Sequence, residues 1–182
     1  VRAGLNIDEI VPRFSFFFAA HIEFFEEIAK FRAARRIWAR WMREKYRARD
    51  PRAWKLRFHV RTAPSSLAKR EQLENNVVRT TLEALAAVLG GAQSLHASAL
   101  DEAAGLPSAF SSQLALRTQE VLAYESSVAQ TADPLGGSYL VESLTDRIEE
   151  EVENYFKKID EAGGVIRGVE SGFFQKEITA SA

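Results

Sequence analysis

The strongest constraint on the fold is a threefold alternation between short apolar runs and segments with helical periodicity. The first run, FSFFFA at residues 14–19, is continuously apolar, as expected of a strand buried on both faces. Strands that alternate with helices form parallel βαβ units with right-handed crossovers. Asn75 or Asn76 is expected to cap the second helix. We therefore predict an α/β fold with strands at 14–19, 56–62 and 93–98 and helices at 21–46, 77–89 and 107–126.

The C-terminal part of the chain follows a different pattern. A turn-forming cluster, DPLGGS, occupies residues 133–138. After it, the charge and apolar pattern predicts an amphipathic helix at 143–162, which Gly163-Gly164 would end. A short helix at 165–168 and an irregular tail from Phe173 complete the expected organisation.

Three strand–helix units cannot close a barrel, because closure takes about eight strands. The sheet would keep two open edges, and an unpaired strand edge binds further strands. We therefore expect a partner that supplies the missing strands, or a second copy of the chain, and so an oligomer.

Composition narrows the classes of partner. The 182 residues carry a net charge of −1, so no global field attracts nucleic acid or acidic lipid. No apolar run reaches the roughly 18 residues that a membrane span needs, so no membrane partner is expected. The chain has no cysteine, which excludes disulfides and thiolate metal sites and fits a reducing, cytoplasmic setting.

Polar side chains gather where the second and third predicted strands end, the edge at which α/β proteins carry their chemistry. His59 and Arg61 alternate out of the second strand on one face, while Gln93 and His96 belong to the third. Each histidine is either a packed core residue or a ligand contact. No carboxylate stands at metal-ligand spacing with them, so no metal site is expected. Glu102, just before a proline-opened helix, either stabilises that helix end or faces the site.

Arg13, Ser15 and Phe17 form a second candidate set at the first strand. If that strand lies at residues 11–14, the three side chains line one side of its exit, because strand side chains alternate with a period of two. An arginine there suits a phosphate, and a phenylalanine suits a pantetheine-like arm. If instead Arg13 precedes the strand, its role is structural.

Several sequence runs together are specific to one protein family. They are PRFSFFF, FFEEIAKFRAARRIWA, LRFH, ENNVVRTTLEALAAVLGGAQSLH, ALDEAAGLP, LALRTQEVLAYES and DPLGGSYLVESLTD. Over nearly its whole length the chain resembles the C-terminal half of the substrate barrel of the adenosylcobalamin-dependent acyl-CoA mutases, the methylmalonyl-CoA mutase family. The run FFFAAHIEFFEEIAKFRAARRIWA most resembles the type whose substrate subunit is separate from its cobalamin subunit.

This resemblance implies a fold, a cofactor and partners. The fold would be the last three strand–helix units of a (β/α)8 TIM barrel at residues 1–130, followed by a C-terminal helical extension at 131–182. The barrel is threaded by an acyl-CoA, and the remaining barrel and a cobalamin-binding subunit or domain would be its partners. The implied reaction is a radical 1,2-rearrangement of a methylmalonyl-CoA-like or isobutyryl-CoA-like thioester, for which adenosylcobalamin supplies the radical.

The resemblance also implies two sets of site residues, one for each ligand. The substrate side would be formed by Arg13, Phe14, Ser15, Phe17, His59, Arg61 and Gln93. The cofactor side would be formed by Pro64, Glu102, Ala103 and Leu106. The family's catalytic pair would precede Val1 and its cobalt-ligand motif belongs to the cobalamin domain. No catalytic residue is therefore assigned to this chain, and the isolated chain is expected to be inactive.

Three positions depart from the family pattern. Arg61 stands where the family usually has glutamine, Pro64 where it has glycine, and Ala97 where it has threonine. Because proline is bulkier and lacks an N–H group, it changes how closely the backbone can approach a cofactor. These departures favour an alternative function, a non-catalytic acyl-CoA-binding or assembly module derived from the mutase barrel.

Overall fold

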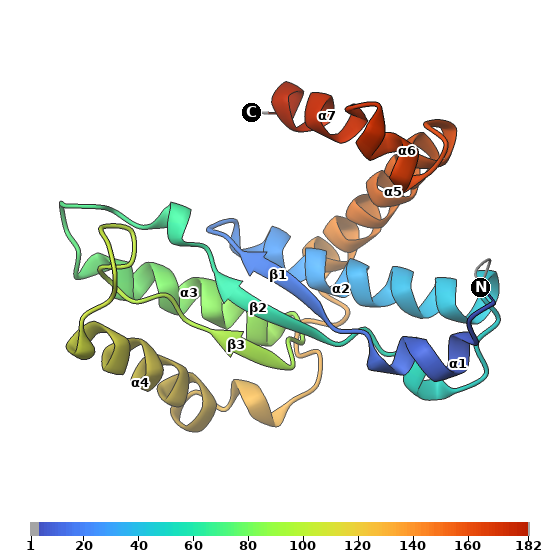
Figure 1. Cartoon of the computed structure of the whole chain (residues 1–182). Helices are drawn as coiled ribbons and strands as arrows, with labels where there is room; N and C mark the ends of the chain where they lie inside the picture. The colour runs from blue at the N-terminus through green and yellow to red at the C-terminus, as the bar shows by residue number, and fades with distance from the viewer. Residues whose placement is uncertain (1–3, 182) are drawn as a thin grey trace. The chain divides into compact units, whose positions relative to one another are not determined.

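The computed structural model describes residues 4–181, and its centre is a parallel sheet of three strands in the order β1-β2-β3 (Figure 1). The strands are β1 (Phe16–Ala20), β2 (Phe58–Thr62) and β3 (Ser94–His96). Their register places Phe17 opposite His59 and Arg61 opposite His96. The structure thus confirms an α/β fold with a small parallel sheet, and this arrangement is compatible with part of a barrel.

The sequence left open whether the first strand lies at residues 11–14 or whether Arg13 precedes it, and the structure decides between these alternatives. A first strand at residues 11–14 is wrong, because Val11–Arg13 form a 3-10 turn that follows the short helix α1 (Ile7–Ile10). Pro12 explains the turn, since its fixed φ suits the first positions of a helical turn and it has no N–H to donate. Arg13, Phe14 and Ser15 therefore precede β1.

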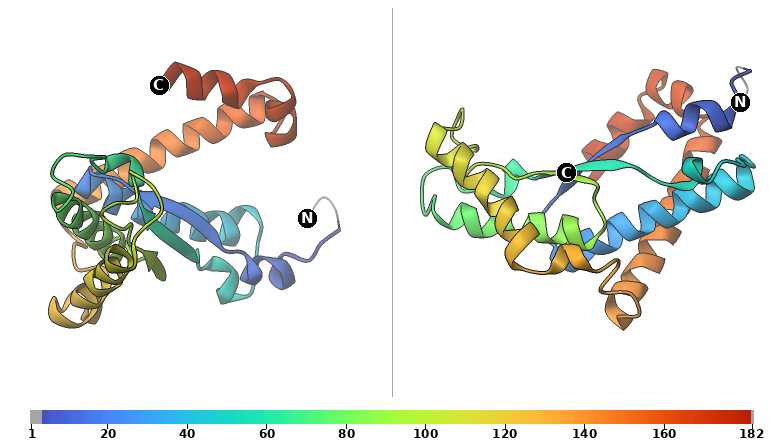
Figure 2. Two further views of the ribbon diagram at one scale, coloured as in Figure 1. Left: turned by 60° about the vertical axis from the view of Figure 1, so that its left-hand side comes forward. Right: turned by 90° about the horizontal axis from the view of Figure 1, so that it is seen from below.

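Two helices lie side by side against one face of the sheet, α2 (Phe24–Arg40) and α3 (Asn75–Leu89), as Figures 1 and 2 show. Phe31 of α2 stacks on Phe58 of β2, with ring centroids 5.5 Å apart, and both side chains are buried. Val60 and Ala87 complete this core without exposed surface. Packing of this kind is the main stabilising contribution to such a layer.

The opposite face of the sheet is open. The exposure along β1 alternates, and Phe17 is 72% exposed, so the expectation that this strand is buried on both faces is wrong for the chain alone. A strand with one packed face and one open face follows from the period of two. The open face carries polar and aromatic side chains, which are described below.

The remaining helices and turns connect these layers. A single π-helical turn at Trp41–Lys45 prolongs α2, and 3-10 turns lie at Pro51–Trp54, Pro64–Ser66 and Val128–Gln130. Helix α4 (Ala109–Glu125) begins two residues after the expected start at 107, because Ser108 is its N-cap, whose side chain accepts a hydrogen bond from the N–H of Ser111. Among residues 4–181, no helix is both long and apolar enough to cross a membrane.

Arg32 of α2 fixes the turn that follows residue 130. Its guanidinium donates to the Asp133 carboxylate at 2.8 Å, to Glu142 Oε1 at 2.8 Å and to Thr145 Oγ1 at 3.2 Å. The hydrogen bond from Arg32 lowers the pKa of Glu142 to about 2. Helix α5 (Tyr139–Glu161) begins four residues before the expected start at 143, and it carries the two residues Glu142 and Thr145 that bond to Arg32.

Contacts divide the chain into two compact units, Val1–Thr145 and Asp146–Ala182. The second unit contains most of α5, then α6 (Val165–Glu170) and α7 (Phe173–Ser181), so the expected tail from Phe173 is in fact a helix. Gly168 permits this packing, because a Cβ there would lie 2.7 Å from Phe174 Cε2. The glycine pair at 163–164 has positive φ angles of 88° and 90°, in accord with the expected helix end.

A substitution at Gly90 tests the packing of α3 on α2. A Cβ at Gly90 would lie 2.6 Å from Phe31 Cδ2 and 2.9 Å from Phe31 Cβ, in the fully buried core. We expect Gly90→Ala to lower the free energy of unfolding by roughly 1–3 kcal/mol through overpacking, measured by urea denaturation. Gly105→Ala is the control, since its Cβ would meet no atom within 4 Å. Equal stability of the two variants would contradict this packing.

Candidate functional site

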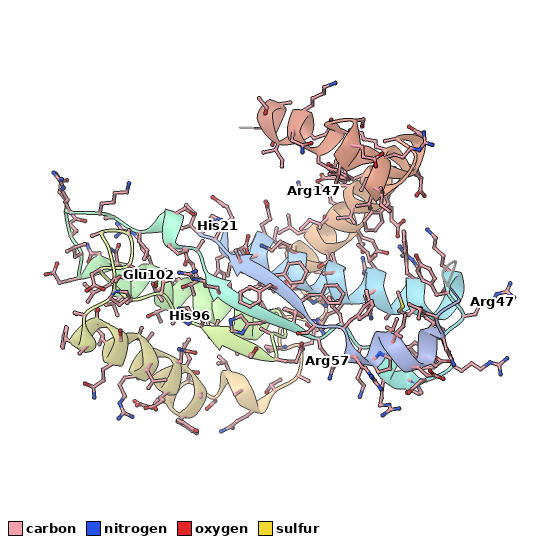
Figure 3. The ribbon with its side chains drawn as sticks, viewed as in Figure 1. His21, Arg47, Arg57, His96, Glu102 and Arg147 are labelled. Carbon is pink, nitrogen blue, oxygen red and sulfur yellow. The ribbon has the colours of Figure 1, made fainter. Side chains whose placement is uncertain are left out.

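A pocket of about 570 Å³ lies over the open face of the sheet and extends from Phe17 and His59, the second residues of β1 and β2, to the carboxyl ends of the strands. Figure 3 shows His96 and Glu102 at this end and Arg57 at the opposite end of β2. The pocket is lined from the sheet by Phe17, His59, Arg61 and His96, from the loop after β3 by Ala97, Ala99, Glu102 and Pro107, and from α4 by Ser112, Ala115, Leu116 and Gln119. The carboxyl ends of parallel strands are where α/β folds bind their ligands.

Strand alternation places the pocket's aromatic and basic groups on one face. His59 and Arg61 share this face of β2, as the sequence predicted, and Phe17 of β1 lies opposite His59. The Phe17 and His59 rings contact one another with centroids 4.4 Å apart. His59 Nδ1 lies 2.7 Å from Ser94 Oγ on β3, so the three strands contribute adjacent side chains to one surface.

An ion pair links the middle strand to the loop that follows β3. Arg61 Nη2 donates a hydrogen bond to Glu102 Oε1, and Glu102 Oε2 accepts one from the N–H of Ala99 at 2.9 Å. The Glu102 side chain is 13% exposed and that of Arg61 44% exposed, so the pair is only partly shielded from water. Glu102 therefore faces the pocket, and its carboxylate also fixes the turn in its own loop.

His96 is held in its neutral form by its surroundings. Partial desolvation lowers the pKa of His96, and electrostatic interaction with Arg61 and, to a smaller extent, His59 lowers it further. A neutral imidazole offers one donor and one acceptor nitrogen instead of a charge. At neutral pH this side of the pocket therefore presents hydrogen-bonding groups beside one charged pair.

The structure brings only part of the predicted substrate side together. Arg13, Phe14 and Ser15 are exposed and lie before β1, at the amino end of the sheet. Arg13 borders a separate hollow of about 450 Å³ with Asp8, Glu9, Pro12 and Arg52. Arg57 donates to the carbonyl oxygens of Pro12 and Phe14, which holds this segment beside the start of β2.

Gln93 also lies at the amino end of the sheet. Its Oε1 accepts a hydrogen bond from the N–H of Phe58 at 2.7 Å, and its Nε2 donates to the carbonyl oxygen of Gly91 at 2.7 Å. Because Phe58 is the first residue of β2, this amide joins the beginnings of two strands. Its side chain contacts the backbone and does not line the pocket with His96.

The predicted cofactor side lies on the two loops beyond the strand ends. Pro64 opens the 3-10 turn after β2 and is half-buried, as is Ala103 in the loop after β3. Leu106 is 97% exposed, and Arg61 Nε is buried without a hydrogen-bond partner. An apolar side chain this exposed is available for contact with a further molecule.

Sequence reasoning missed the side chains that support these loops. The expectation that Asn75 or Asn76 caps α3 is wrong, because the N-cap is Glu74 and it makes no side-chain cap hydrogen bond. Asn76 is instead fully buried and bonds to both loops, and Thr80 and Glu83 are buried on the same helix. Polar residues spaced four and three apart on an otherwise apolar helix face were the available signal.

The arrangement suits binding better than nucleophilic catalysis. Among residues 4–181, no three metal-ligating side chains come together. Ser94 has a histidine at hydrogen-bond distance, but no carboxylate among the described residues is bonded to that imidazole to orient it. A serine nucleophile normally needs such an oriented base.

Comparison with known proteins decides the family. The family model described as methylmalonyl-CoA mutase matches residues 1–182. The chain belongs to the methylmalonyl-CoA mutase family. It is 49% identical over 177 residues to the 2-hydroxyisobutanoyl-CoA mutase large subunit of Aquincola tertiaricarbonis, an alignment that covers 97% of this chain and 31% of that protein.

Other relatives in the methylmalonyl-CoA mutase family match with similar coverage. The chain is 46% identical to the methylmalonyl-CoA mutase of Escherichia coli (strain K12), over 98% of this chain and 25% of that protein. It is 45% identical to a probable mitochondrial methylmalonyl-CoA mutase of Caenorhabditis elegans, over all of this chain and 24% of that protein. The chain thus spans 24–31% of the length of these three relatives.

Removing the positive charge of Arg61 should change the titration of His96. We expect Arg61→Gln to raise the pKa of His96 toward its ordinary value, because a nearby cation no longer opposes protonation and Glu102 loses its partner. The measurement is an NMR pH titration of the His96 ring protons. Arg57→Gln, at the other end of β2, is the control and should leave this titration unchanged. A His96 pKa that is identical in the wild type and Arg61→Gln would contradict the electrostatic coupling.

Proposed function

We propose that the chain forms the last three strand–helix units of the substrate barrel of an adenosylcobalamin-dependent acyl-CoA mutase. The reaction would be the 1,2-rearrangement of a methylmalonyl-CoA-like or isobutyryl-CoA-like thioester. The observation that carries the proposal is the two-sided sheet, with Phe17, His59, Arg61 and His96 on the face that α2 and α3 leave open. In a closed (β/α)8 barrel, helices cover the outer face of the sheet, so the face that α2 and α3 leave open would become the interior.

The proposed substrate extends along the barrel axis and so meets both ends of the sheet. At the amino end, Arg13 with Phe14 and Ser15 suits the phosphate-bearing part of coenzyme A, since a guanidinium binds phosphate through paired hydrogen bonds. Along the face, Phe17 provides apolar contact for the pantetheine arm. Beside Phe17, His59 would bind the thioester or a neighbouring carboxylate together with Arg61, which lies nearer the carboxyl end of β2.

Gln93 has a supporting part in this proposal. Its amide holds the beginnings of β2 and β3 in register, and this register determines which side chains lie opposite one another. A slip of one residue would move every side chain of a strand to the other face. Gln93 therefore acts on the substrate side through the backbone.

The proposed cofactor side consists of Pro64 and the loop that carries Glu102, Ala103 and Leu106. The exposed Leu106 side chain offers apolar contact to the cofactor. When bound, adenosylcobalamin supplies the radical chemistry of the rearrangement. The residues of this chain hold the ligands in place and exclude water from that side.

The proposed partners are the remaining strands of the barrel and a cobalamin-binding subunit or domain. Within the described residues, β1 and β3 each pair only with β2, so the outer edge of each strand is open. Lys30 Nζ already donates to the carbonyl oxygen of Ala19 on β1 at 2.8 Å, and a lysine at an edge limits unspecific strand pairing. Because the interior face is open, the isolated chain would not catalyse the rearrangement.

A specific observation supports the alternative function as well. Arg61 Nη2 donates to Glu102 Oε1 at the pocket, and this ion pair leaves both charged groups less available to a substrate or cofactor. In that case the chain would bind acyl-CoA, or assemble with other strands, without taking part in catalysis. The two functions differ in their dependence on adenosylcobalamin.

A grafted enzyme tests the proposed function. The matching segment of the Aquincola tertiaricarbonis large subunit is replaced by this chain, and the product is purified with the relative's cobalamin-binding partner. We expect acyl-CoA isomerisation that depends on adenosylcobalamin, because 49% identity over 177 residues preserves the barrel packing. The isolated 182-residue chain should show no turnover under the same conditions.

Two controls give each outcome a clear meaning. The unmodified relative sets the reference rate, and native mass spectrometry confirms that the grafted subunit assembles. An assembled graft that binds isobutyryl-CoA but is inactive with adenosylcobalamin would support the binding module and overturn the mutase proposal. Turnover by the isolated chain would overturn the expectation that it needs the remaining barrel.

A further inference from the structure

Helix α3 carries a row of buried polar side chains, Asn76, Thr80 and Glu83, which the proposed substrate and cofactor contacts do not use. Their spacings of four and three residues place them on one face of the helix. Their exposed fractions are 0%, 2% and 1%, so each needs hydrogen-bond partners inside the protein. Apart from Arg79 of the same helix, which donates to Asn76 Oδ1 at 2.8 Å, the partners described below are in the two loops that follow β2 and β3.

Asn76 bonds to both loops at once. Its Oδ1 accepts from the N–H of Ala68 at 2.9 Å, and its Nδ2 donates to the Ala68 carbonyl oxygen at 2.9 Å and to the Leu100 carbonyl oxygen at 2.7 Å. Ala68 belongs to the loop that begins at Pro64, and Leu100 lies two residues before Glu102. One buried amide thus fixes the separation of the two proposed cofactor-side loops.

Thr80 fixes the chain directly after β3. Its Oγ1 donates to the Ser98 carbonyl oxygen at 3.3 Å. The Ser98 N–H donates to Thr62 Oγ1 at 2.8 Å, and Ser98 Oγ donates to the Thr62 carbonyl oxygen at 3.0 Å. Helix α3 and the end of β2 therefore hold Ser98 between the pocket-lining residues Ala97 and Ala99.

Glu83 is the third residue of the row and bonds to the start of the loop after β2. Its Oε2 accepts from the N–H of Ala63 at 3.1 Å, directly before Pro64, while its Oε1 is buried without a partner among the described residues. Burial raises the pKa of Glu83. This third contact places the start of the loop after β2 relative to the same helix.

We propose that Asn76 and Thr80 are positioning residues, which hold the loop after β2 and the loop after β3 in the geometry that the cofactor side of the pocket requires. The importance of this geometry for catalysis rests on the proposed function, whereas the positioning itself does not. A polar group at each position is needed because the bonded loop atoms are backbone groups that would otherwise be buried without partners.

The sequence NNVVRTT offers a matched control beside each residue. Asn75 is exposed and its side chain donates to Gln72 Oε1, and Thr81 Oγ1 donates to the Val77 carbonyl oxygen of its own helix. The four variants are Asn76→Ala with the control Asn75→Ala, and Thr80→Val with the control Thr81→Val. Thr80→Ser, which keeps the hydroxyl group, is the conservative variant.

Amide hydrogen exchange of the full chain, followed by mass spectrometry, is the test. We expect Asn76→Ala and Thr80→Val to speed exchange in peptides covering residues 63–70 or 97–104 by about tenfold or more, with little change in β1 and β2. Thr80→Ser should restore slow exchange, and both controls should match the wild type. Equal exchange in Thr80→Val and Thr81→Val, or faster exchange throughout the sheet, would overturn the proposal.

If Asn76→Ala does not fold, the Thr80 pair decides the outcome. In the active grafted enzyme, Thr80→Val should weaken the apparent affinity for adenosylcobalamin about tenfold and leave the KM for the acyl-CoA nearly unchanged. A rise in KM with unchanged cofactor affinity would overturn the assignment to the cofactor side. An inactive graft whose loops still show the expected exchange pattern would refute the proposed function alone.

Discussion

The structure depends on one constraint, the requirement that one face of a three-stranded parallel sheet be dry. Phe58 and Val60 pack under α2 and α3, with no more than 2% of either side chain exposed. Because side chains alternate along a strand, this packing places His59 and Arg61 on the other face. The position of the pocket is therefore set by the core behind it, and the chemistry of the pocket residues plays no part in locating them.

Helix α3 relates the core to the loops. Its C-terminal half packs Ala87 against the sheet and ends at Gly90, where the chain must pass close to Phe31. Its N-terminal half carries Asn76 and Thr80, which bond to backbone groups beyond the strand ends. A single helix thus contacts both the sheet and the loops beyond the strand ends. Loops held by such a rigid element are positioned more precisely than loops held only by their own contacts.

The part of the fold that follows from periodicity could be predicted from the sequence. Alternating strands and helices gave the parallel sheet, and the period of two gave the shared face of His59 and Arg61. The spacing of Asn76 on an apolar helix face could have predicted that its side chain is buried, but long-range hydrogen bonds carry no periodic signal, so the backbone partners of Asn76 and Gln93 were not predictable. The α7 helix was missed for a similar reason, because it depends on Phe174 packing where Gly168 has no side chain. The resemblance to the family suggested which residues contact a ligand, but it did not predict which of these residues lie at the amino end of the sheet and which at the carboxyl end.

If the chain is part of a barrel, as we propose, the electrostatics of the pocket would explain how it keeps the geometry of a site without the activity. The Arg61–Glu102 pair and the neutral His96 lie on a face that is open to water, where ion pairs contribute little. If further strands close over this face, as we propose, the local dielectric constant falls and each of these interactions strengthens. Desolvation would then lower the pKa of His96 further and hold Glu102 more firmly beside Arg61. Closure would therefore do more than bring in the missing residues, because it would also strengthen the contacts that this chain already makes.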